Sequence, residues 1–492
     1  MAHNFYYDET EHSRKINLKT LKADNYYDNF ITVIVGWDEK YEPEIEEKYL
    51  AFEDKYQGRK SKGELKSTTL SQKQFKNGFA SMTDDNIAFV SDFLNLFDEH
   101  VYWCFSSQSK VEFIIHQLFA NYHNDLILDA DAVKYSIVKA INTYKPDRVM
   151  ECIYENPEQL VVELKSFLKD RIEKNKANIQ LKENENIAYE QLLIILDDVE
   201  PLISEDWDYH IPFDGFAKYL VEQKISDYKL VIDREGSDQK TLIAAKHMGH
   251  ESAVEEDSKD YIGIRMADMM AGLLTKFMKS MNTALHSNYD VVSKVVLEEK
   301  WFNLDEIRKQ LYRRFHYVIS ELNDSWDKSY AGLFTDDLLS FISLLEFIDE
   351  NTVEQLKNSN CPELFNRYCI SNLQGRLEEI HHKLPREDIR LDNEGCFINK
   401  WGAKVYADAT KQPGLEIENG MCECEVVNAG FDAKGIPTVT IYEDGEYNCY
   451  RSPEQLGEWA MTLVAYKNRG QAVLPAMVRF AKQGGRWYAD IL

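Results

Sequence analysis

The chain has 492 residues, more than one hydrophobic core usually supports, so we expect roughly two to four domains. Its 44% hydrophobic and 12% aromatic content is that of an ordinary globular protein and excludes a long disordered chain. The formal net charge of -27 makes the surface repel nucleic acid on average, so any nucleic-acid site has to be local.

Cysteine content and hydropathy bear on where the protein works. Eight cysteines in a chain of this length do not form a disulfide scaffold, and no secretory apolar segment follows Met1. No apolar run approaches the roughly 20 residues that cross a bilayer. We therefore expect a cytoplasmic protein with no membrane partner.

The first hundred residues are predicted to form short strands and one helix. Segments rich in β-forming residues cover Phe5–Asp8, Phe30–Val35 and Glu64–Thr69. Apolar residues at helical spacing follow over Ile87–Phe97, and Val101–Phe105 has the composition of a buried strand. This order predicts the beginning of an α/β sheet.

A long helical region is predicted next. Leu160, Leu164 and Leu168 follow one another at steps of four, the spacing of a buried helix face. A strand pattern returns at Tyr228–Asp233, and a helix over about Tyr261–Met281 completes the block. Acidic residues of the early and late strands would therefore meet across a helical insertion.

The remaining chain is predicted to be helical first and mainly β afterwards. Amphipathic helices continue to a boundary near Lys383-Leu384-Pro385, and glycines then punctuate short β-prone segments, with one helix near Pro453–Tyr466. The expected fold class is an α/β core with a helical insertion, followed by an α-helical region and a small mainly-β C-terminal domain. The expected boundaries are 1–110 and 227–282 for the core, 111–226 for the insertion, 283–384 for the helical region and 385–492 for the last domain.

Acidic residues stand at the ends of several apolar segments. Asp8 and Glu9 end the first strand, Asp233 ends a later one, and Asp268 lies in an apolar helix. A carboxylate at the end of a buried strand costs desolvation free energy unless it is paired, hydrogen-bonded or bound to a cation, so several together suggest Mg²⁺ or Mn²⁺. Strand alternation puts Asp8 and Glu9 on opposite faces. We predict Asp8 as a ligand and Glu9 as a ligand or a supporting residue, with strand-end solvation as the alternative.

Further candidates surround these acids. Glu64 and Lys66 would share one strand face, where the carboxylate could bind metal while the ammonium approaches a phosphate; a surface ion pair is the alternative. Asp257 precedes the late helix and is either a weaker metal ligand or a helix cap. For Asp268, the alternative to metal binding is a salt bridge to Arg265 or to a nearby lysine.

Together these residues resemble a known family, the domain of unknown function 3800. The resemblance is carried by Phe5-Tyr6-Tyr7-Asp8-Glu9, Glu64-Leu65-Lys66, Leu230-Val231-Ile232-Asp233, Asp257-Ser258-Lys259 and Ala267-Asp268-Met269-Met270-Ala271-Gly272, and it covers roughly residues 1–105 and 227–280. Thr10-Glu11-His12 departs from the small, glycine-containing turn that commonly follows the first acids. The resemblance implies an RNase H-like fold with a metal-dependent nuclease-like core, in a family that often occurs in bacterial mobile or defence loci.

The leading hypothesis is a metal-dependent nuclease that hydrolyses phosphodiester bonds of DNA or RNA. Asp8, Glu64, Asp233 and Asp268 would hold two Mg²⁺ or Mn²⁺ ions, and Lys66 would neutralise a non-bridging phosphate oxygen. The alternative from another class is a non-catalytic RNase H-like scaffold whose acidic surface binds a protein partner, which explains the net charge more easily. A third reading, a metal-independent hydrolase with two carboxylates as acid and base, predicts activity that survives chelation.

Two stretches are candidates for contacting nucleic acid. The first is the basic segment Lys55–Lys66, followed by Lys73 and Lys76, with a solvated loop as the alternative. In the second, basic and aromatic residues alternate near the C-terminus, with a β-domain surface as the alternative. Its members are Tyr466, Arg469, Arg479, Phe480, Lys482, Arg486 and Trp487.

Overall fold

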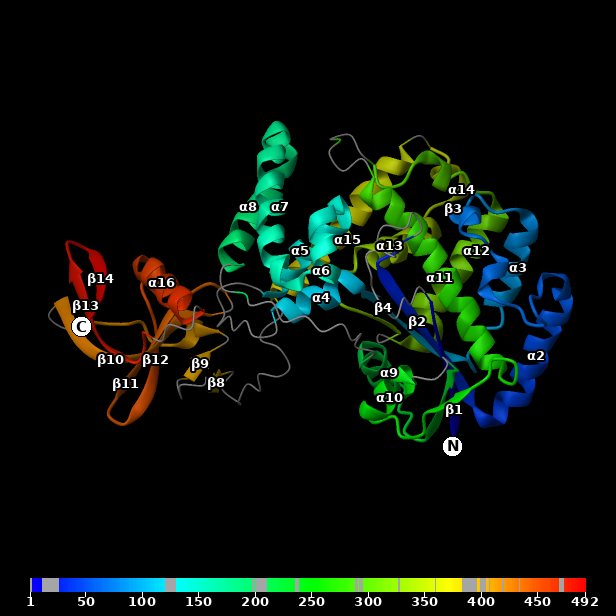
Figure 1. The fold of residues 1–492 in the computed structure, drawn as a ribbon, viewed down its shortest axis with the longest axis horizontal. Helices are drawn as coiled ribbons and strands as arrows, with labels where there is room; N and C mark the ends of the chain where they lie inside the picture. Colours follow the sequence, from blue (N-terminus) through cyan, green and yellow to red (C-terminus); the bar gives the residue numbers. More distant parts are fainter. Residues whose placement is uncertain are drawn as a thin grey trace.

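The computed structural model places most of the chain in two bodies of regular structure (Figure 1). It describes all residues except 1, 11–25, 120–129, 197–198, 200–209, 235–238, 288–290, 292–294, 326–327, 359, 383–395, 399–403, 407, 418–419, 433 and 469–472. The described residues form an α/β unit around a mixed six-stranded sheet, and an antiparallel five-stranded sheet near the C-terminus.

The mixed sheet has the strand order β6-β5-β1-β2-β4-β7. Its strands are β1 (His3–Thr10), β2 (Asn29–Asp38), β4 (Tyr102–Ser109), β5 (Tyr228–Asp233), β6 (Val254–Glu256) and β7 (Ser329–Ala331). β2 runs antiparallel to both β1 and β4, whereas β5 is parallel to β1 and to β6, and β7 is parallel to β4. Every residue of β2 is buried, as expected for a Val- and Ile-rich strand at the centre of a sheet that is covered on both faces.

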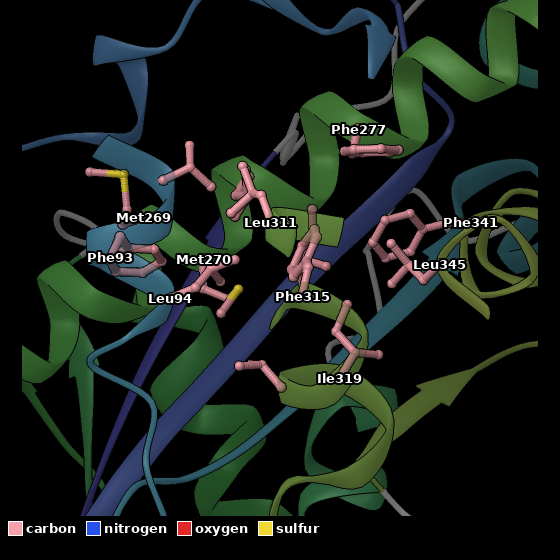
Figure 2. Close-up of a cluster of buried hydrophobic side chains, with 14 of the residues drawn as sticks. Phe93, Leu94, Met269, Met270, Phe277, Leu311, Phe315, Ile319, Phe341 and Leu345 are labelled. Atoms are coloured by element: carbon pink, nitrogen blue, oxygen red, sulfur yellow. The ribbon is translucent and has the colours of Figure 1, made fainter. Parts of the chain in front are cut away.

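Helix α11 (Ile262–His286) covers one face of this sheet and fixes the larger hydrophobic core. It approaches β1 closely at Gly263, where an added Cβ atom would lie 2.1 Å from the Tyr6 ring. Figure 2 shows part of this core, in which Met270 and Phe277 of α11 lie among aromatic side chains such as Phe93 and Phe315. The same core also contains residues of α2 (Glu42–Lys55), β3 (Lys76–Phe79), α3 (Asp84–Leu94), α12 (Glu306–His316), α13 (Asp336–Glu350), α14 (Val353–Leu356) and α15 (Cys361–His382).

Two other groups of helices have cores of their own. Phe213 and Phe216 of α9 (His210–Glu222) pack with Phe5 and Tyr7 on the opposite face of the sheet, next to α10 (Lys240–His247). The insertion between β4 and β5 begins with helices that share a separate apolar cluster. These are α4 (Lys110–Leu118), α5 (Ala130–Tyr144), α6 (Asp147–Glu155), α7 (Leu160–Asn175) and α8 (Ile179–Ile195).

The C-terminal sheet is antiparallel throughout, in the order β12-β11-β10-β13-β14. Its elements are β10 (Met421–Phe431), β11 (Pro437–Glu443), β12 (Glu446–Arg451), α16 (Gly457–Asn468), β13 (Ala476–Gln483) and β14 (Arg486–Ile491), and a small hairpin of β8 (Cys396–Ile398) and β9 (Lys404–Tyr406) precedes them. One face of the sheet packs into a small core that includes Val426, Val439 and Phe480. The predicted mainly-β C-terminal part with one helix is confirmed.

The coarse fold class, α/β with helices and a C-terminal antiparallel sheet, is confirmed, but one predicted strand is wrong. In the segment Glu64–Thr69, Glu64 makes a single isolated bridge to Ser61, and Ser67–Thr69 form a 3-10 turn, η3. Lys62 and Gly63 both have positive φ angles, which turns the chain tightly before Glu64 and ends any extended run there. Glu64 and Lys66 therefore share no strand face, although their side chains form an ion pair at 2.9 Å.

Three further findings concern the expected layout. Residues 283–384 are not purely helical, because β7 joins the main sheet. The helices of this region share their core with α11, since Phe315 and Phe341 belong to it. The expected boundary at residues 383–385 lies outside the described residues. Among the described residues, no helix is both long and apolar enough to cross a membrane.

Candidate functional site

Asp8 and Asp233 lie at the same edge of the main sheet. They follow Tyr7 and Ile232, which are direct partners in the parallel pairing of β1 and β5. Asp8 shares its strand face with Tyr6, whose ring packs under Gly263, and therefore points toward the α11 side. Both carboxylates are partly buried. The parallel pairing of β1 and β5 therefore brings Asp8 and Asp233 to the same end of neighbouring strands, as predicted.

Asp268 joins them from α11 and holds a loop in place. The Ser67 backbone N–H donates to its Oδ2 at 2.8 Å, and the Ser67 hydroxyl donates to its Oδ1 at 2.9 Å. One and two turns further along the helix, Gly272 leaves room for the Ser67 side chain and Lys276 Nζ donates to the Ser67 carbonyl at 3.1 Å. One face of α11, formed by Asp268, Gly272 and Lys276, therefore binds Ser67 and holds in place the loop with Glu64 and Lys66.

Glu64, Lys66 and Ser258 form a closed hydrogen-bonded group. Lys66 Nζ lies 2.9 Å from Glu64 Oε2 and donates to Ser258 Oγ at 3.1 Å, while the Ser258 hydroxyl donates to the same Glu64 oxygen at 3.1 Å. Glu64 is buried, with 7% of its surface exposed, so its charge depends on these partners. The ion pair that was the alternative to metal binding is therefore present, but Glu64 is buried rather than at the surface, and only Lys66 is partly exposed.

Asp257 and Arg265 connect this group to the start of α11. Asp257 Oδ1 accepts the Lys259 backbone N–H at 3.0 Å, and this bond lowers the pKa of Asp257 below its ordinary value. The helix N-cap is Tyr261, so Asp257 does not cap α11. Arg265 binds Glu53 at 3.0 Å and donates to the Ser258 carbonyl at 2.9 Å, which corrects the alternative that it pairs with Asp268.

The acids and Lys66 interact electrostatically. Burial raises the pKa of Asp8 well above its ordinary range, and the charges of Asp268 and Asp233 raise it further, against the opposing effects of the Glu9 backbone N–H and of Lys66. Burial also raises the pKa of Asp233, which Lys66 opposes. Burial disfavours the charged form of Lys66, but Glu64, Asp268 and Asp233 outweigh it and raise the pKa of the ammonium. This excess of carboxylates favours a cation.

We name Asp8, Asp233, Asp268, Glu64 and Lys66 the acidic cluster. Its carboxylate oxygens are the donor set that Mg²⁺ and Mn²⁺ prefer, and the Lys66 ammonium already stands among them as a cation. The donor chemistry therefore fits a hard divalent metal. Within the described part of the chain, however, these carboxylates do not bring three ligand atoms within 4.8 Å of one another.

A different group does meet that distance, at the C-terminal end of α12. His316, Glu321 and Asp349 each offer a ligand atom within 4.8 Å of the others. Asp349 is already engaged by two basic side chains, with His316 Nδ1 at 3.2 Å and Arg313 Nε at 3.5 Å. We interpret this group as an ion-pair network at the surface, because an arginine beside the carboxylate opposes a metal ion.

Glu9 does not join the acidic cluster. Its Oε2 accepts the Tyr7 hydroxyl at 2.6 Å, so its side chain lies on the face of β1 opposite to Asp8. The strand alternation predicted this separation. Of the predicted site residues, the structure therefore brings together Asp8, Glu64, Lys66, Asp233 and Asp268 and leaves Glu9 outside. Asp257 is partly exposed but interacts electrostatically with Asp233 and Lys66.

The two predicted nucleic-acid stretches are largely used within the protein. Arg59 donates to Asn86 at 2.7 Å and Lys60 pairs with Glu53 at 3.0 Å, although Lys62, Lys73 and Lys76 are exposed. The solvated-loop alternative therefore fits Lys62, whereas Lys73 and Lys76 are exposed residues of a 3-10 helix and of β3.

The C-terminal stretch is used in the same way. Arg479 pairs with Glu423 at 2.6 Å, and Phe480 is fully buried and so cannot stack on a base. Lys482 lies over the Trp487 ring, 5.5 Å from its centroid. Arg469 lies outside the described residues. The alternative of a β-domain surface is favoured here.

Sequence reasoning missed Ser67 and Lys276, and it named Ser258 as part of the motif Asp257-Ser258-Lys259. Each is a single polar residue without a pattern of its own. The signal that could have pointed to Lys276 is the four-residue step Asp268-Gly272-Lys276, which places three residues on one helix face. Ser67 gives no such signal, since its role depends on where the loop lies in space.

No family model matches this chain, and neither a curated protein nor a solved structure matches it. The resemblance to the domain of unknown function 3800 therefore rests on the motif residues alone and stays a prediction. What the structure adds is that Asp8, Glu64, Lys66, Asp233 and Asp268, which come from four separate segments of the chain, interact with one another at one edge of the main sheet.

Proposed function

We propose that this protein is a metal-dependent nuclease that hydrolyses phosphodiester bonds of DNA or RNA at the acidic cluster. The observation that carries the proposal is the meeting of Asp8, Asp233 and Asp268 beside Lys66, at the end of two paired strands, with the pKa of Asp8 raised by burial and by the other two acids. Partly buried carboxylates that repel one another are costly unless a cation compensates them. Mg²⁺ or Mn²⁺ is the cation that an all-oxygen donor set favours.

The sheet supports an RNase H-like reading of the core. Three antiparallel strands, β4, β2 and β1, are followed by the parallel strands β5 and β6 on the β1 side, and α11 packs across one face. This arrangement is consistent with the fold that the family resemblance implies. A role in defence against foreign nucleic acid would follow from that resemblance.

The residues have separable roles in the proposed reaction. Asp8, Asp233 and Asp268 would hold the metal, with Glu64 and Asp257 at its flanks. A bound ion lowers the pKa of the attacking water and stabilises the negative charge of the leaving oxygen. Ser67 fixes both Asp268 oxygens, so this carboxylate is oriented before any ligand arrives. The Lys66 ammonium would neutralise a non-bridging phosphate oxygen.

A second candidate is a non-catalytic scaffold that binds a protein partner through its acidic surface. Two observations favour it: Glu64 and Lys66 already neutralise each other, and the cluster does not bring three ligand atoms within 4.8 Å. The net charge of -27 also suits a basic protein partner better than a nucleic acid. This candidate predicts that the protein binds no divalent metal at the cluster.

The experiment that separates the candidates is a cleavage assay on single- and double-stranded RNA and DNA, with Mn²⁺, with Mg²⁺ and with EDTA. Asp8→Asn and Asp233→Asn test the cluster, and Asp54→Asn, an exposed acid on α2, is the matched control for the loss of one charge. We expect metal-dependent cleavage that falls by about a hundredfold or more in the two cluster variants and is unchanged in the control. Cleavage that survives EDTA would instead support the metal-independent hydrolase, and no cleavage of any substrate would support the scaffold.

A further inference from the structure

The Lys66 ammonium lies among the carboxylates of Glu64, Asp233 and Asp268, which attract it. Two of its three N–H donors are used by groups from separate segments, Glu64 at 2.9 Å and Ser258 at 3.1 Å. Ser258 is itself positioned, because Arg265 binds its carbonyl and its hydroxyl donates to Glu64. The ammonium is thus held at a defined place rather than extended into solvent.

The charge of Lys66 acts on the acids that would hold a metal. The ammonium lowers the pKa values of Asp8 and Asp233 and is in turn stabilised by Asp233 and Asp268. A divalent ion bound by these carboxylates would therefore lie within reach of the same ammonium. Two cations in one partly buried site repel each other strongly, because the interior screens charge less than water does.

We propose that Lys66 is the resident counter-cation of the acidic cluster and that a divalent metal must displace its ammonium from Glu64 in order to bind. The inference rests on the proposed metal-dependent function and deepens it, since it states what the cluster contains before the metal arrives. It assigns Lys66 two positions, one on Glu64 and Ser258 in the metal-free protein and one directed toward substrate in the metal-bound protein.

The exchange would serve the proposed reaction in two ways. Glu64, once released from Lys66, becomes a carboxylate with a vacant acceptor site beside the metal. The displaced ammonium becomes able to bind a phosphate oxygen, and it does so only when metal is present. Metal binding and phosphate binding would then support each other, with Lys66 as the link.

The test is calorimetric titration of Mn²⁺ into the full-length wild type and four variants. Lys66→Met removes the ammonium, and Lys66→Gln removes the charge while an amide can still donate to Glu64. Ser258→Ala removes one partner of Lys66 and leaves its charge. Lys73→Met is the matched control, because Lys73 is an exposed lysine close in the chain and its loss changes the net charge equally.

We expect Mn²⁺ to bind about tenfold tighter to both Lys66 variants than to the wild type, and within about twofold of the wild type to Lys73→Met. Ser258→Ala should shift the affinity in the same direction by a smaller factor. In the absence of metal, Lys66→Met should unfold at a lower temperature than the wild type, and saturating Mn²⁺ should raise its midpoint by more than it raises that of the wild type.

The outcomes separate this inference from the function on which it rests. Equal or weaker Mn²⁺ binding by both Lys66 variants would overturn displacement and make Lys66 a supporting residue of an intact metal site. No binding by the wild type or by either Lys66 variant would overturn the metal site together with the displacement. If Lys66→Met does not fold, Lys66→Gln decides, because its amide can take the place of the ammonium between Glu64 and Ser258.

Discussion

Ser67 donates two hydrogen bonds to the carboxylate of Asp268, 201 positions later in the chain. The backbone N–H binds Oδ2 at 2.8 Å and the hydroxyl binds Oδ1 at 2.9 Å. The loop with Glu64 and Lys66 is therefore fixed by α11, the helix whose packing forms the main core. The position of this loop in the acidic cluster therefore depends on the packing of α11 in the core.

Replacement of the Ser67 side chain tests this link. We expect Ser67→Ala to lower the free energy of unfolding by about 1–2 kcal/mol, because it removes a hydrogen bond to a charged group while the backbone bond remains. Thr68→Ala, which removes an exposed hydroxyl from the next residue, is the control and should change stability by less than about 0.5 kcal/mol. Urea unfolding measures both, and equal effects would show that the hydroxyl bond is not stabilising.

Gly272 is a second point of this contact. A Cβ atom there would lie 2.2 Å from the Ser67 Cβ and 2.6 Å from its Oγ, so we expect Gly272→Ala to cost about 1–3 kcal/mol and to displace the loop. Gly375 lies in α15 with nothing near an added Cβ, and Gly375→Ala should instead stabilise by roughly 0.5–1 kcal/mol. Thermal unfolding distinguishes the two signs, and stabilisation by Gly272→Ala would mean that the loop does not pack on α11.

A buried carboxyl away from the acidic cluster predicts a pH dependence of stability. Asp337 accepts hydrogen bonds from Tyr27, Asn29 and Asn282, and burial raises its pKa from 3.8 to about 7. Between these two pKa values the folded protein binds a proton that the unfolded chain has lost. Protonated Asp337 therefore stabilises the folded protein fully below about pH 3.8. This stabilisation declines as the pH rises to about 7 and is lost above that pH.

The variant Asp337→Asn isolates this effect, because it cannot ionise. Relative to the variant, the wild type should lose roughly 4 kcal/mol of unfolding free energy between pH 4 and pH 8. Urea titrations at several pH values measure this difference. A difference that is independent of pH would show that Asp337 ionises in the folded protein as it does in the unfolded chain.

Glu112 ties the helical insertion to the segment before α13. Its two oxygens accept the backbone N–H groups of Leu333 and Phe334, each at 2.7 Å, and its side chain is buried. Glu112→Gln has one acceptor oxygen for these two donors, so we expect a loss of about 2 kcal/mol. Glu151→Gln, an exposed acid in α6, should change little; an equal loss there would mean that the effect is one of net charge.

Much of the sheet could be predicted from the sequence because its strands are apolar and short. β5 begins and ends at the predicted residues, and β1, β2 and α11 extend the predicted segments by a few residues. β6 and β7 have three residues each, too few for a periodic signal. The predicted strand over Glu64–Thr69 was wrong because residue preference alone does not register the turn at Gly63 or the bonds from Ser67 to α11.

The candidate site was predictable in part for a different reason. Asp8 and Asp233 end neighbouring strands, and strand alternation alone separates Asp8 from Glu9. The hydrogen bonds from Ser67 to Asp268, from Lys66 to Ser258 and from Ser258 to Glu64 join residues 201, 192 and 194 positions apart. No local pattern encodes such contacts, so only the folded structure shows them.

Calorimetric titration of Mn²⁺ into the wild type and Asp8→Asn, at the same pH and ionic strength, tests directly whether the acidic cluster binds metal. We expect saturable binding to the wild type that weakens by about tenfold or more in the variant, because Asp8 is a partly buried carboxylate of the acidic cluster. Binding of equal affinity in both proteins would place the metal elsewhere, and absence of binding to the wild type would contradict a metal-dependent function for this site.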